Sequence, residues 1–84
     1  MNTNEEIYYE KQNKKVAEAT ALALNASNGM PLNKTELRKV IWLQKLAAKM
    51  VAYHMTHDTY LLKLWANKGR HAGKAIELNV QRMF

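Results

Sequence analysis

Residues 34–68 read KTELRKVIWLQKLAAKMVAYHMTHDTYLLKLWANK, and this stretch decides the fold. Its apolar residues recur every three or four positions, which is the spacing of one face of an α-helix. Neither this stretch nor the rest of the chain has the alternating pattern of a β-strand. We therefore predict an all-α fold, a small helical hairpin or bundle of three or four helices.

The sequence His57-Asp58-Thr59 leaves two alternatives open within this stretch. Asp is a favoured N-cap residue, so Asp58 can begin a new helix. The chain would then form helices at about 34–56 and 58–68. In the other alternative, residues 34–68 form one long helix.

Turn-forming residues delimit the elements on either side. The run Ser27-Asn28-Gly29-Met30-Pro31 ends a first helix at about 4–26, because Gly favours a left-handed C-cap and Pro cannot continue the helix. Asn33 followed by Glu36 is the spacing of a capping box, which marks the next helix start. Two glycines predict a turn over residues 68–73, followed by a last short helix at about 74–83.

Composition limits the class of protein. The chain has 84 residues and no Cys, so it fits a single domain, residues 1–84, without disulfides or thiolate metal sites. A domain of this size has a thin core, so we expect a homodimer or higher oligomer to add burial.

No signal peptide and no apolar run of about 20 residues is present, which predicts a cytoplasmic protein without membrane insertion. Abundant Lys and Asn would suit a phage gene.

The formal net charge of +6 is unevenly distributed. Residues 1–33 carry 3 basic and 4 acidic groups, and this near-neutral part reads as a packing helix with its loop. Residues 34–84 carry 10 basic and 3 acidic groups. A partner of the basic region is therefore expected to be anionic.

Basic residues gather on one edge when residues 34–68 are placed on a helical wheel. That edge carries Lys34, Arg38, Lys45, Lys49 and Lys63. The opposite half carries Leu37, Val40, Ala47, Ala48, Val51, Met55, Leu61, Leu62 and Trp65. A break near Asp58 would remove Lys63 from the row. A solvated helix edge is the alternative interpretation, but few acidic residues are interspersed.

Three aromatic residues, Trp42, Tyr53 and Tyr60, flank the basic edge on the wheel. Aromatic rings beside a basic row can stack on bases of a bound nucleic acid. They can equally form the rim of the core or an interface with a protein.

The predicted glycine turn carries a second basic group, Lys68, Arg70 and Lys74. Glycines before a helix N-terminus can expose backbone amides to a phosphate. Only three residues separate Gly69 from Gly73, and Ala75 follows Lys74, so the Walker pattern is not met. The alternative is a plain helix connection with solvated charges.

Catalytic and metal sites are not predicted. His54, His57 and Asp58 are one helical turn apart, but a polar contact or a helix break accounts for them better than a metal does. No nucleophile–base pair and no convergent pair of carboxylates occurs, so we expect neither an enzyme nor a cofactor.

Three functions remain. The first is a small non-enzymatic cytosolic regulator that binds a polyanion, most plausibly nucleic acid, through the basic edge. The second is a protein interaction module, phage-encoded, that docks an acidic host protein through its helical face. The third is a binder of a small phosphorylated ligand such as a nucleotide.

Overall fold

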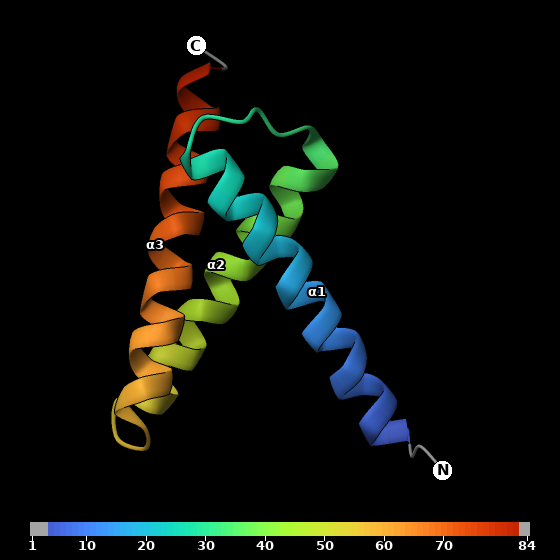
Figure 1. The fold of residues 1–84 in the computed structure, drawn as a ribbon, viewed down its shortest axis with the longest axis vertical. Helices are drawn as coiled ribbons and strands as arrows, with labels where there is room; N and C mark the ends of the chain where they lie inside the picture. The colour runs from blue at the N-terminus through green and yellow to red at the C-terminus, as the bar shows by residue number, and fades with distance from the viewer. Residues whose placement is uncertain (1–3, 83–84) are drawn as a thin grey trace.

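The computed structural model consists of three α-helices, α1 (Asn4–Ser27), α2 (Lys34–His54) and α3 (Thr59–Arg82) (Figure 1). It describes the backbone of residues 4–82 and the side chains of residues 12–82. No strand occurs within that part of the chain, so the all-α prediction is confirmed. Met83, which the predicted last helix included, lies outside the described residues.

The end of α1 follows the predicted signal. Gly29 has a positive φ of 111°, a conformation that glycine adopts without steric cost. The amide of Gly29 donates to the carbonyl of Ala26 at 3.0 Å, and that of Met30 donates to Asn25 at 3.1 Å. This pair of bonds is a Schellman motif, which satisfies the last free carbonyls of the helix.

The start of α2 also follows its predicted signal. The side chain of Asn33 accepts a hydrogen bond from the Glu36 amide at 2.8 Å, and the Glu36 carboxylate accepts one from the Asn33 amide at 3.0 Å. This reciprocal pair is the capping box expected from the sequence.

The helix is interrupted at residues 55–58, so the alternative of one long helix over 34–68 is wrong. Asp58 is the N-cap of α3, since its carboxylate accepts from the Leu61 amide at 3.0 Å. Its backbone carbonyl accepts from the Leu62 amide at 2.9 Å, which begins the new helix. The two helices therefore fold back on one another as a hairpin.

We expect Asp58→Ala to lower the free energy of unfolding by about 1 kcal/mol, because it removes this capping bond. Asp58→Asn removes the charge and keeps a capping oxygen, so it should stay within about 0.5 kcal/mol of the wild type. Urea denaturation followed by circular dichroism measures both. Equal losses in the two variants would mean that the charge, and not the cap, matters.

The predicted turn at 68–73 is wrong, as is the separate last helix at 74–83. The segment runs through α3 as continuous helix, and within the described residues only Gly29 has a positive φ. The physical reason is close packing. A Cβ atom on Gly69 would lie 3.4 Å from the Ala47 Cβ, and one on Gly73 would lie 3.4 Å from the Gln44 side-chain nitrogen. The glycines thus let α3 approach α2 closely.

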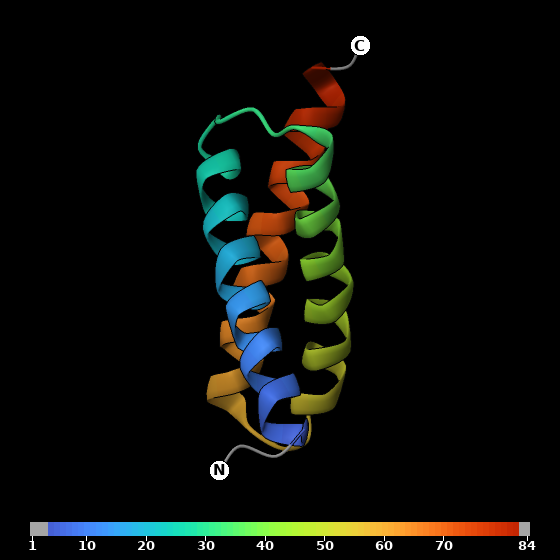
Figure 2. The same ribbon diagram turned by 90° about the vertical axis from the view of Figure 1, so that its right-hand side faces the viewer.

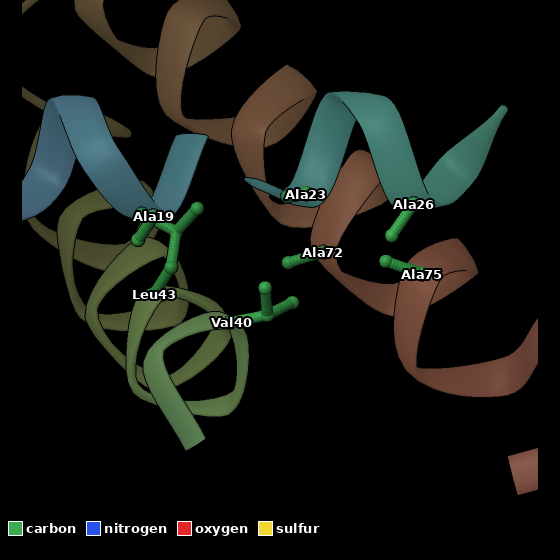
Figure 3. Packing of buried hydrophobic residues seen from close by; sticks show 7 residues of the cluster. All are labelled: Ala19, Ala23, Ala26, Val40, Leu43, Ala72 and Ala75. Atoms are coloured by element: carbon green, nitrogen blue, oxygen red, sulfur yellow. The ribbon is translucent and has the colours of Figure 1, made fainter. Parts of the chain in front are cut away.

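The core lies where the three helices meet and consists mostly of alanine (Figure 3). Its fully buried members are Ala19, Ala23, Ala26, Val40, Leu43, Ala72 and Ala75. Leu43 and Val40 are the largest of them. Buried Asn79 connects α3 to the loop between α1 and α2, because its side-chain oxygen accepts a hydrogen bond from the Leu32 amide at 3.0 Å.

Helices α2 and α3 run antiparallel and side by side, and the second half of α1 packs against them (Figure 1, Figure 2). The first half of α1 diverges from the pair (Figure 1). The radius of gyration is 13.9 Å. A compact domain of this length would have about 12 Å. None of the helices in the described part offers a stretch with the length and apolarity needed to cross a membrane.

Candidate functional site

The first candidate surface is the outer edge of α2. It carries Lys34, Arg38, Lys45 and Lys49, which are all exposed, and we call it the α2 edge. Ala47 faces Gly69 of α3. Lys45 and Lys49 each lie two residues from Ala47, and so about 160° around the helix from it. The α2 edge therefore points away from α3.

The second candidate surface is the outer side of α3. It carries Lys63, Arg70 and Lys74, which are exposed, and we call it the α3 edge. These three residues lie about 100–140° around the helix from Gly69, which packs on α2. The break at 55–58 therefore does remove Lys63 from the α2 row. Two basic edges border the hairpin in place of one long stripe.

Lys68 belongs to neither edge. Its side chain is half-buried, donates to the Thr20 hydroxyl of α1 at 3.3 Å, and lies over the Trp65 ring at 5.9 Å. Because residues 68–73 are helical, Lys68, Arg70 and Lys74 surround no exposed helix N-terminus. The structure thus separates Lys68 from Arg70 and Lys74, which stay together on the α3 edge.

Few acidic groups neutralise the two edges. Among the side chains of residues 12–82, the only ion pair joins Lys39 to Glu18, and neither residue belongs to an edge. Glu36 and Asp58 are engaged in helix caps, and Glu77, which is exposed about 20° around α3 from Arg70, forms no ion pair within residues 12–82. Arg70 donates to the side chain of Asn67 at 3.0 Å, a neutral partner. The edge cations therefore retain the capacity to meet an external anion.

The three predicted aromatics have different environments. Trp42 packs against the core, and the Lys15 ammonium lies 4.1 Å from its ring centroid. Tyr53 is 58% exposed and stacks on His57, with ring centroids 4.3 Å apart and planes 5° from parallel. Tyr60 is 74% exposed. Tyr60 is nine positions before Gly69, about 180° around the helix, so it points away from α2.

A groove of about 310 Å³ runs between α2 and α3. It is lined by Gln44, Ala47, Ala48, Val51, Trp65, Ala66, Gly69 and Arg70. Lys39, which pairs with α1, lies nine residues and so about 180° from Ala48. The groove therefore opens on the side of the hairpin away from α1. Its floor is apolar, and a basic edge lies on each side.

The group His54, His57 and Asp58 forms local contacts. Asp58 caps α3, and the His57 Nδ1 atom lies 2.6 Å from the Tyr53 carbonyl oxygen. The His54 Nδ1 atom is buried without a hydrogen-bond partner in the structure. Within the described range, no three His, Cys, Asp or Glu side chains converge into a group able to hold a metal ion.

Two features of this region were not predicted. Predicting the groove requires knowing that Gly69 faces Ala47, and no local sequence pattern indicates this contact. The Tyr53–His57 ring pair lies across the end of α2, where helical periodicity no longer applies. A His four residues after an aromatic, just before an Asp cap, is the one local signal that could have indicated it.

When the chain is compared with protein-family models, with curated proteins and with solved structures, none of the three comparisons gives a match, so the functional argument rests on the residues described above.

Proposed function

We propose that this chain is a small non-enzymatic regulator that binds nucleic acid through the α2 edge and the α3 edge. The observation that carries the proposal is the set of seven exposed cations on two adjacent helices, none of them ion-paired within residues 12–82. Phosphate groups release condensed counterions when such cations approach, and this release supplies most of the sequence-independent affinity of nucleic-acid binding.

Neutralising the α2 edge tests the proposal. We expect Arg38→Ala, Lys45→Ala and Lys49→Ala together to weaken binding to an oligonucleotide by at least about tenfold at low salt. The salt slope should also become shallower by about one for each phosphate that the variant no longer neutralises. Fluorescence anisotropy measures both, and circular dichroism checks that the helices remain.

Single substitutions provide a matched control. Lys14 on α1 and Lys45 on α2 are both exposed, so replacing either by Ala removes the same charge. Lys45→Ala should weaken binding, whereas Lys14→Ala should leave it nearly unchanged. Equal effects would mean that total charge, and not the α2 edge, determines the affinity.

A second candidate function is favoured by the groove. An apolar floor between two basic edges suits an amphipathic helix of an acidic protein, the second function predicted from the sequence. Ala48→Trp would fill the groove and leave every edge cation in place. If the wild type binds a synthetic acidic amphipathic peptide, Ala48→Trp abolishes that binding, and the wild type does not bind an oligonucleotide at low salt, this candidate is supported over the first.

Self-association belongs to the same proposal. The largest fully buried side chains of the core are only Leu43 and Val40, so a second chain would add burial that this small domain lacks. Light scattering coupled to size-exclusion chromatography tests it, and a mass equal to one chain at every concentration contradicts it. The cytoplasmic location and the phage origin stay predictions from the sequence.

A further inference from the structure

The C-terminal end of α2 carries a fixed pair of aromatic rings. The Tyr53 and His57 rings are parallel within 5°, and their centroids are 4.3 Å apart. The His57 Nδ1 atom lies 2.6 Å from the Tyr53 carbonyl oxygen, to which it donates in the tautomer that carries its proton on Nδ1, and 3.0 Å from the Thr56 hydroxyl oxygen. This bond holds the His57 ring in place against Tyr53.

The ring pair continues the line of the α2 edge. Lys45, Lys49 and Tyr53 follow one another at intervals of four residues, so they occupy successive turns on nearly the same side of the helix. Tyr53 is 58% exposed and His57 is exposed, so both rings are open to solvent in part. A strand whose phosphates contact Lys45 and Lys49 would bring its next bases to these rings.

We infer that the Tyr53–His57 pair stacks on an unpaired base, and that the chain binds single-stranded nucleic acid in preference to a duplex. The inference rests on the proposed function. A single strand and a duplex both present phosphates to the α2 edge. In a duplex, however, the base faces are already stacked on one another, whereas a single strand can offer a free face to an aromatic ring.

The other predicted aromatics are poorer candidates for this role. The Trp42 ring packs on the core and carries Lys15 over it. Tyr60 is the most exposed aromatic residue in the described part, yet it lies on the side of α3 that points away from α2. Tyr60 lies about 40–60° around α3 from Lys74 and Lys63 of the α3 edge, so it provides a comparison between an exposed tyrosine beside that edge and Tyr53 beside the α2 edge.

Anisotropy titrations of the full chain with three oligonucleotides of equal length test the inference. The probes are an oligothymidylate, a duplex, and an abasic strand that keeps the phosphates and lacks the bases. We expect the oligothymidylate to bind about tenfold more tightly than the abasic strand, and also more tightly than the duplex. Equal affinity for the oligothymidylate and the abasic strand overturns the inference without any variant.

Variants then locate the stacking site. Tyr53→Leu keeps apolar bulk and removes the ring, so it should weaken oligothymidylate binding about tenfold and leave abasic binding unchanged. Tyr53→Phe should stay within about twofold of the wild type, and Tyr60→Leu should weaken oligothymidylate binding less than Tyr53→Leu does. An equal loss in Tyr53→Leu and Tyr60→Leu would contradict the assignment to the ring pair.

Different results would contradict nucleic-acid binding and base stacking. Salt-dependent binding of all three probes with equal affinity would leave nucleic-acid binding standing and remove the base-stacking site. Absence of binding to any probe at low salt would overturn both.

Discussion

Leu43→Ala should lower the free energy of unfolding by about 2–5 kcal/mol. Leu43 is fully buried at the meeting point of the three helices (Figure 3). Most of the surrounding core side chains are alanines, which are too short to fill the cavity that the substitution leaves. A domain of this length has a total stability of about 4–13 kcal/mol, so the loss is a large fraction of the whole.

Urea denaturation followed by far-UV circular dichroism measures this loss. Leu64→Ala is the matched control, because it makes the same change at a residue of α3 that is 38% exposed. It should cost about 1–1.5 kcal/mol, because much of the Leu64 side chain is already in water. If Leu43→Ala costs no more than Leu64→Ala, the three helices do not share the core described above.

Gly69→Leu should destabilise the protein by about 1–3 kcal/mol, because it overpacks the contact between α2 and α3. A Cβ on Gly69 already contacts the Ala47 Cβ at 3.4 Å, so the rest of a leucine side chain either pushes the helices apart or turns into the open groove that Gly69 lines. The loss of ellipticity on heating measures the effect, with the midpoint temperature compared between the variant and the wild type.

Gly73→Ala is the counterpart and should stabilise the protein by about 0.5–1 kcal/mol. Alanine favours the helix over glycine by this amount, and the nearest group is the movable end of the Gln44 side chain. A turn with a positive φ at Gly73 would give the opposite sign. Destabilisation by Gly73→Ala, or a neutral Gly69→Leu, would therefore favour the turn over the continuous helix.

Local signals in the sequence predicted the helix ends because capping is a short-range interaction. Gly29, Asn33 and Asp58 each act through hydrogen bonds to residues no more than four positions away. Gly69 and Gly73 have no such local determinant. A glycine is tolerated within a helix when a neighbouring helix approaches it closely, and that neighbour is more than 20 residues away in the sequence.

Helical periodicity predicted the exposure of the basic residues well but failed beyond the break. Lys34, Arg38, Lys45 and Lys49 are exposed as the wheel placed them. Met55 was placed in the apolar half, yet it is 67% exposed because α2 ends at His54. Leu43 lies about 140° around the same wheel from Arg38, at the angle of Leu61, so the wheel does place it in the apolar half, although it was not named there; it is fully buried.

The salt dependence of oligonucleotide binding is the most direct test of the proposed role of the two basic edges. With between four and seven phosphates neutralised, the slope of log K against log salt concentration should be about −3 to −6. Anisotropy titrations of the wild type at increasing salt concentrations measure it. A slope in this range is the predicted result, and a slope near zero, or no binding at low salt, would contradict nucleic-acid binding by these edges.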